Sequence, residues 1–169
     1  MLKEKFYPWA DKISPDVSVC WATLWGLGTL RAPGTWGSAF GILFYCMFFS
    51  TLNIVAFLIF VALFAYLAAG VCDAAESALG EKDPGMINLD EFVAMPLCFM
   101  PICHASYNAL WLLLGFAIFR FLDIRKPAFV ARLQEAEGGA GIVLDDLACA
   151  AITGLIVNAL YYVVESFAK

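Results

Sequence analysis

The sequence predicts an all-α protein, a polytopic membrane helix bundle of about five short helices arranged as two hairpins plus a final span. Its composition is the first reason: 63% of the 169 residues are hydrophobic, 15% are charged, and the mean hydropathy is +0.82. A soluble domain is about half apolar and about a quarter charged. The second reason is that charged residues are missing from residues 38–72, 92–119 and 147–164. A helix that spans a bilayer needs roughly 20 apolar residues, and a soluble fold would lack the polar surface to cover three such runs.

The chain is expected to form a single membrane-embedded domain over residues 1–169, with a polar N-terminal segment at residues 1–16. That segment lacks the layout of a cleaved signal peptide, so we expect the mature chain to begin at or near Met1. The formal net charge of −5 argues against nucleic acid as a partner. The six cysteines include no CxxC pair and lie in apolar stretches, which predicts packing residues rather than disulfides or a metal cluster.

The first long run, residues 38–72, predicts a helical hairpin. At 35 residues it is too long for one span, and it is interrupted by the polar residues Ser50, Thr51 and Asn53. We therefore expect helices at about residues 38–49 and 53–72. A final span is expected at about residues 142–164.

The second run, residues 92–119, is compatible with one tilted helix or with two short helices. Pro101 removes a helical hydrogen bond, and His104, Ser106 and Asn108 follow it as a small polar cluster that looks like a turn. A continuous helix of 28 residues would separate its two ends by about 42 Å. We favour the hairpin, because it would bring both ends of this run to one face of the bundle.

With two hairpins, most of the ionisable residues converge on a single face, together with the loop at residues 31–38. These residues are Asp90, Glu91, Arg120, Asp123, Lys126, Asp145 and Asp146. Most of the lysines and arginines lie on the same face, and the positive-inside rule makes it cytoplasmic.

Two of the converging segments are loops that enter apolar helices. In the first, Pro33 and Gly34 predict a turn, and Thr35 or Ser38 can cap the following helix, whose free amides attract an anion. Taken alone, an ordinary loop and cap is the more common interpretation. In the second, a glycine-rich loop at residues 138–141 leads to Asp145 and Asp146, which eighteen uncharged residues follow. Such a carboxylate pair is costly in a membrane unless it is paired, solvated or bound to a metal.

The other two segments combine charges at the ends of the second run. Asp90 and Glu91 are adjacent carboxylates at the mouth of an apolar segment, where they suit either helix capping or a hard cation such as magnesium. Arg120 and Asp123 are three residues apart and share a helix face, which fits an intrahelical ion pair as well as a functional site. Lys126 and the proline after it are expected to end that helix.

Elimination narrows the chemistry that these residues support. The only histidine, His104, is expected in a turn on the opposite side of the membrane, so a histidine nucleophile is excluded. No cysteine is followed six positions later by arginine, so the loop of a phosphatase with a thiolate nucleophile is absent. No Asp-x-Asp sequence occurs, so a mechanism through an aspartyl phosphate is unsupported. The remaining carboxylates, basic side chains and hydroxyls suit attack by a metal-activated water, with cations neutralising phosphoryl oxygens.

At these four segments the chain resembles the phosphatidylglycerophosphatase A family of small bacterial membrane phosphatases, from about residue 26 to residue 154. The matching motifs are Pro33-Gly34-Thr35-x-Gly37-Ser38, Asp90-Glu91-Phe92-Val93, Phe119-Arg120-x-x-Asp123-x-x-Lys126-Pro127 and Gly138-Gly139-x-Gly141-x-x-x-Asp145-Asp146. The resemblance implies magnesium-dependent hydrolysis of phosphatidylglycerol phosphate to phosphatidylglycerol at the bacterial cytoplasmic (inner) membrane. Ala94, Ala150 and Ala128-Phe129 depart from the family pattern without removing an ionisable group.

The mechanistic hypothesis is a carboxylate cage for one or two Mg²⁺ ions that acts on a phospholipid substrate. Its metal-binding and catalytic residues would be Asp90, Glu91, Asp123, Asp145 and Asp146. Arg120 and Lys126 would hold the substrate phosphate, with the segment from Thr35 to Ser38 as an additional anion seat. Two alternatives stay open: another membrane lipid-phosphate phosphatase, such as one for polyprenyl diphosphate, and a non-enzymatic small transporter or cation-binding protein. The general base and the oligomeric state are left open.

Overall fold

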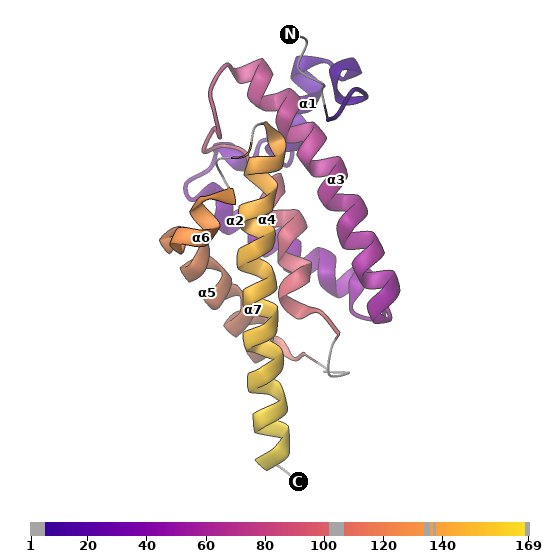
Figure 1. Cartoon of the computed structure of the whole chain (residues 1–169), viewed down its shortest axis with the longest axis vertical. Helices are drawn as coiled ribbons and strands as arrows, with labels where there is room; N and C mark the ends of the chain where they lie inside the picture. Colours follow the sequence, from indigo (N-terminus) through magenta and orange to yellow (C-terminus); the bar gives the residue numbers. More distant parts are fainter. Residues whose placement is uncertain (1–5, 102–106, 134–135, 137, 168–169) are drawn as a thin grey trace.

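The computed structural model is a helix bundle, and it describes residues 6–101, 107–133, 136 and 138–167 (Figure 1). No strand occurs among these residues, which confirms the predicted all-α class. In chain order the helical elements are η1 (Ala10–Lys12), α1 (Pro15–Ala22), η2 (Leu27–Thr29), α2 (Pro33–Phe44), η3 (Tyr45–Phe49, a π-helix), α3 (Ile54–Leu79), α4 (Leu89–Ala94), η4 (Met95–Phe99), α5 (Ala109–Arg125), α6 (Ala128–Ala131) and α7 (Gly139–Phe167).

The first predicted hairpin is present, with its break at the expected polar residues. The helix of α2 and η3 ends before Ser50, and the Asn53 side chain caps α3 by accepting a hydrogen bond from the Ala56 amide at 3.0 Å. Both helices are longer than predicted. Helix α2 begins at Pro33 rather than at Ser38, and α3 continues through the charged residues that follow the apolar run.

The second run also forms a hairpin. Helix α4 and the short helix η4 end at Phe99, and α5 begins after Asn108, whose side chain accepts hydrogen bonds from two amides in the first turn of α5. At the other end of the run, Arg120 Nη1 lies 3.4 Å from Glu91 Oε1. A continuous helix would hold these residues roughly 42 Å apart, so the preference for a hairpin is confirmed. His104 and Ser106, assigned to the turn, lie outside the described residues.

Helix α7 runs through the length of the bundle, between α3 on one side and α5 and α6 on the other (Figure 1). Among the described residues, α3 and α7 are long and apolar enough to cross a membrane. Their 26 and 29 residues correspond to about 39 Å and 43 Å. Both are longer than the helices predicted at residues 53–72 and 142–164, because each extends past the end of its uncharged run. The described chain begins and ends at opposite ends of the bundle.

Close packing of α2 against α4 depends on glycines. A Cβ atom added at Gly37 would lie 2.5 Å from the Asn88 carbonyl oxygen, and one at Gly41 would lie 2.7 Å from the Phe92 carbonyl oxygen. Only a hydrogen in place of a side chain lets the two backbones approach so closely. This contact sets the first turn of α2 beside the first turn of α4, where two of the predicted site carboxylates lie.

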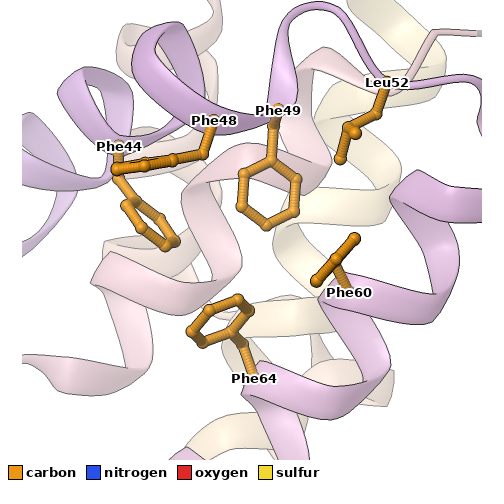
Figure 2. A pocket seen from close by; sticks show the side chains of 6 residues that line it. All are labelled: Phe44, Phe48, Phe49, Leu52, Phe60 and Phe64. Carbon is orange, nitrogen blue, oxygen red and sulfur yellow. The ribbon is translucent and has the colours of Figure 1, made fainter.

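Packing elsewhere rests on apolar and small side chains. Phe57, Phe99 and Phe119 are fully buried in the main core. Phenylalanines also gather where η3 turns into α3 (Figure 2). The five cysteines that the structure describes are free thiols, three of them buried, in agreement with the predicted packing role. Cys103 lies outside the described residues.

Candidate active site

Three of the predicted carboxylates meet between α4 and α7. Asp90 and Glu91 stand in the first turn of α4, and Asp146 in the second turn of α7. One oxygen from each lies within 4.8 Å of the others. The Oδ1 atom of Asp90, the Oε2 atom of Glu91 and the Oδ2 atom of Asp146 are buried without a hydrogen-bond partner in the structure. We call Asp90, Glu91 and Asp146 the carboxylate triad.

Helix α5 contributes an arginine and a fourth carboxylate beside the triad. Arg120 Nη1 donates to Asp123 Oδ2 at 2.6 Å, as the three-residue spacing predicted, and it also reaches Glu91 Oε1 at 3.4 Å. The Arg120–Asp123 contact is thus an intrahelical ion pair that extends to a neighbouring helix. Asp123 is buried and lies within hydrogen-bonding reach of Asp146. Arg120 therefore fixes α5 against α4 next to the triad.

A lysine and a fifth carboxylate lie on the α7 side of the site. Lys126 Nζ donates to Asp145 Oδ2 at 2.6 Å, and the Asp145 side chain is only 2% exposed. Lys126 is the residue at which α5 ends, as predicted, and its φ of +35° is unusual for a residue other than glycine. Burial by itself lowers the pKa of Lys126, but the hydrogen bond and charge of Asp145 outweigh it, so the pKa is raised. The ammonium group therefore stays protonated.

The charges of this site are unbalanced. The five carboxylates that the structure brings together meet two basic side chains, Arg120 and Lys126. Burial, and next the charge of Glu91, raise the pKa of Asp90 well above its ordinary value. A divalent cation would compensate the surplus negative charge, and the unpartnered buried oxygens are the hard ligands that magnesium prefers. A fourth buried oxygen without a partner is Asp145 Oδ1, on the residue before Asp146 in α7. The donor set therefore fits a metal ion.

The predicted anion seat on α2 is only partly at the site. A Cβ atom on Gly34 would collide with Glu91 Oε1 and the Arg120 guanidinium, so the first turn of α2 lies against the charged cluster. The expectation that Thr35 or Ser38 caps α2 is wrong, because the helix begins at Pro33 and no side chain caps it. Thr35 is exposed. Ser38 is fully buried, and its hydroxyl donates to the Gly34 carbonyl at 2.7 Å.

Two residues outside the predicted set hold the helix ends that form the site. The Asn88 side-chain amide is buried and donates to the Pro33 carbonyl at 3.3 Å, which ties the start of α4 to the start of α2. Asp73 on α3 accepts a hydrogen bond from the Gly139 amide at 3.2 Å, which ties α3 to the start of α7. Asn88 stands beside the Asp90-Glu91 motif, so the sequence drew attention to its segment. Nothing in the local pattern marked Asp73.

Comparisons with known proteins relate the chain to one family. The family model described as phosphatidylglycerophosphatase A matches residues 20–161. A Haemophilus influenzae protein named phosphatidylglycerophosphatase A is 38% identical over 132 residues, which cover 78% of this chain and 80% of that protein. An Escherichia coli protein of the same name is 30% identical over 133 residues, covering 78% of this chain and 73% of the relative. No solved structure matches the chain.

The family match covers all five clustered carboxylates and both basic side chains, from Asp90 to Asp146. It also covers α3 and most of α7, the two helices apolar enough to cross a membrane, which fits a membrane protein. The resemblance seen in the four motifs is thereby confirmed. The chain belongs to the phosphatidylglycerophosphatase A family and is a phosphatase, a phosphoric monoester hydrolase.

Proposed function

We propose that the protein hydrolyses phosphatidylglycerol phosphate to phosphatidylglycerol and phosphate in a magnesium-dependent reaction. The observation that supports this most is the buried carboxylate triad with unpartnered oxygens, flanked by one arginine and one lysine. The names of the two relatives supply the lipid. The same donor set would also serve another lipid phosphate, so the substrate requires direct measurement.

The triad oxygens of Asp90, Glu91 and Asp146 would hold the ion, with Asp123 and Asp145 close enough to complete or orient its ligand set. Bound there, magnesium would lower the pKa of a water molecule and neutralise charge on the phosphoryl oxygens. A carboxylate of the cluster would orient a water molecule and accept its proton as the water oxygen attacks phosphorus. The bond between phosphorus and the headgroup oxygen would break, and this oxygen would leave as an alcohol after taking up that proton.

Arg120 and Lys126 would receive the phosphate. Their side chains are 18% and 31% exposed, and the ion pairs described above leave other N–H donors of each group unused. Arg120 contacts the triad residue Glu91, and Lys126 contacts Asp145, the residue before Asp146. A phosphate between them would be contacted by both cations. The amides in the first turn of α2, beside Gly34, would add donors for an anion.

For the membrane, we propose a multi-pass arrangement in the bacterial cytoplasmic (inner) membrane with the site facing the cytoplasm. The support is the excess of lysine and arginine at the site end of the bundle. Single cysteines introduced as Asp83→Cys and Leu133→Cys, after replacement of the native cysteines, should both react with an impermeant thiol reagent from the cytoplasmic side only. Reaction of the two positions from opposite sides would overturn this topology.

The test of the activity is phosphate release by the purified protein from phosphatidylglycerol phosphate, a polyprenyl diphosphate and a phosphoinositide, each with magnesium and with a chelator. We expect release from the first lipid, loss of release on chelation and recovery when magnesium is restored. Preference for the diphosphate or for the phosphoinositide would identify the alternative, a phosphatase for another membrane lipid phosphate. Absence of release from any lipid phosphate, with magnesium binding retained, would instead favour the cation-binding or transport alternative.

The metal site has a readout that is independent of turnover. Magnesium at about 100 times its dissociation constant should stabilise the protein by roughly 2.7 kcal/mol, which raises the melting temperature by about 5 °C or more for a chain of this size. The shift should be absent in Asp90→Asn and present in Asp16→Asn, an exposed carboxylate in the first turn of α1. An equal shift in both variants would place the ion elsewhere.

A further inference from the structure

A second feature beside the triad is an apolar cavity of about 210 Å³ between α1, η2, α2 and α4. Its lining consists of Trp21, Leu24, Trp25, Leu27, Phe40, Leu89 and Phe92. Leu89 and Phe92 are three residues apart on α4 and share a face of that helix. Asp90 and Glu91 stand between them in sequence, so the cavity lies within one helical turn of the triad.

Two tryptophans lie at the surface on the rim of the cavity. Trp21 is 51% exposed and Trp25 is 75% exposed, whereas Leu24 between them is only 5% exposed. Leu24 and Trp25 have positive φ angles of +46° and +56°, and Gly26 follows at +89°. Such a conformation costs free energy for residues with a side chain. In this segment Leu24 is the buried part of the cavity lining and Trp25 the exposed part.

The tryptophans indicate the level of the membrane surface at this end of the bundle. Tryptophan is enriched where a bilayer meets water, because its ring is apolar and its N–H is polar. Four of the five tryptophans in the chain precede Gly37, at the end of the molecule that carries the charged site. The mouth of the cavity therefore lies near the headgroup level, and the apolar lining leads from there along α2 and α4.

We propose that this cavity receives an acyl chain of the same lipid whose phosphate is bound at the triad. The proposal rests on the proposed lipid phosphatase function. Phosphate and acyl chain belong to one molecule joined through glycerol, and the two sites lie on adjacent faces of a single short helix, α4. The acyl chain moves from the apolar bilayer into an apolar cavity, so its surroundings change little. The cavity therefore serves mainly to orient the lipid, so that the lipid phosphate faces Arg120 and Lys126.

The apolar cavity at the other end of the bundle provides a matched control. It is lined only by apolar side chains, from the last residue of α2, from η3, from α3 and from the turn between η3 and α3, so it lies at the end of α2 opposite to Gly34 (Figure 2). Phe40 lines the cavity at the triad and is 42% exposed, and Phe60 lines the distant one and is 43% exposed. Replacing either by alanine removes a ring of similar exposure.

Binding is tested first, with the wild-type chain in lipid vesicles that contain a phosphatidylglycerol phosphate carrying a diazirine in one acyl chain. After illumination, mass spectrometry of peptides should find the lipid on the segments around Trp21 and Phe40, in excess of the segments around Phe48 and Phe60. An excess of unlabelled phosphatidylglycerol phosphate should remove this difference. Equal labelling at the two cavities, unaffected by the unlabelled lipid, would overturn the proposal.

Kinetics provide the second test. We compare kcat/KM for a long-chain phosphatidylglycerol phosphate with kcat/KM for a water-soluble short-chain analogue. The ratio of the first to the second should fall about tenfold in Phe40→Ala, which corresponds to roughly 1.4 kcal/mol of lost selectivity. In Phe60→Ala this ratio should equal that of the wild type. An unchanged ratio in a folded Phe40→Ala protein would reject the acyl-chain site. If wild-type protein releases no phosphate from either substrate, the proposed function fails instead, and the two failures are thereby distinguished.

Discussion

The two ends of the α2–α3 hairpin are built from opposite kinds of residue. At the start of α2, glycines allow helices to touch, and the adjoining carboxylates keep buried oxygens without partners. At the turn between η3 and α3, aromatic rings fill the space (Figure 2). The ring centroids of Phe44 and Phe64 are 5.3 Å apart and those of Phe49 and Phe57 are 5.5 Å apart, both pairs edge to face. One end has buried carboxylate oxygens without hydrogen-bond partners in the structure. The other end supplies aromatic packing.

This contrast indicates that the aromatic end of the bundle contributes mainly stability and the carboxylate end mainly chemistry. Aromatic pairs of this kind stabilise a fold beyond the area they bury, whereas buried carboxylates without partners cost free energy. Helices α3 and α7 connect the two ends, so the packed end holds the framework on which the charged end is assembled. Substitutions at the charged end should therefore change activity, and those at the packed end should change stability.

The largest effect on activity is expected for Asp90→Asn. Loss of one charged triad oxygen should lower kcat/KM for phosphatidylglycerol phosphate by more than about a hundredfold. Mutation of a residue that only hydrogen-bonds to a metal ligand already costs up to about a hundredfold, and Asp90 is proposed to bind the metal directly. Steady-state phosphate release in excess magnesium measures it. Asp145→Asn should also lose activity, and normal turnover by both variants at matched folding would reject the metal cage.

A smaller but still large effect is expected for Gly34→Ala. The added methyl group would collide with Glu91 Oε1 and the Arg120 guanidinium, and a displacement of about 1 Å at a reacting group costs up to about a hundredfold. The matched control is Gly85→Ala, since a Cβ atom there would meet nothing within 4 Å. Wild-type kcat/KM in Gly34→Ala would show that the first turn of α2 does not position the site.

Lys126→Ala should have an intermediate effect. It removes the 2.6 Å hydrogen bond to Asp145 and one cation that faces the substrate phosphate, a loss of about tenfold in kcat/KM, as expected for one hydrogen bond to a charged group. Lys126→Arg keeps the charge and should retain more activity than the alanine variant. Equal rates for the arginine and alanine variants would indicate that charge at this position does not matter.

The smallest effect on activity is expected at the packed end, for Phe49→Ala. Phe49 is 3% exposed, and truncation of such a ring destabilises a folded protein by about 3–5 kcal/mol. The melting temperature should fall clearly, while kcat/KM per folded molecule stays at the wild-type value. Phe48→Ala, at 56% exposure, should change either quantity little. A loss of activity in Phe49→Ala at full folding would break the separation between the two ends.

Sequence patterns alone located most of the helices, because their cause is local. The polar break at Ser50 to Asn53, the helix end at Lys126 and the uncharged runs all act within a few residues, and all appear in the structure. The helix ends were less predictable. Helix α2 begins before Ser38 and α3 extends beyond Cys72, since contacts with α4 and α7, rather than composition, support these turns.

The sequence by itself determined the kinds of group at the site and, through the hairpins, the end of the bundle that holds them. Only the tertiary structure decided their partners. It groups Asp90, Glu91 and Asp146, pairs Asp145 with Lys126, and gives Arg120 two carboxylates. The physical reason is distance along the chain: apart from the intrahelical Arg120–Asp123 pair, which the spacing predicted, the contacts between different helices join residues 19 to 56 positions apart. Their geometry also depends on Gly34, whose missing side chain leaves room for Glu91 and Arg120, and no local pattern of apolar and charged residues encodes that contact.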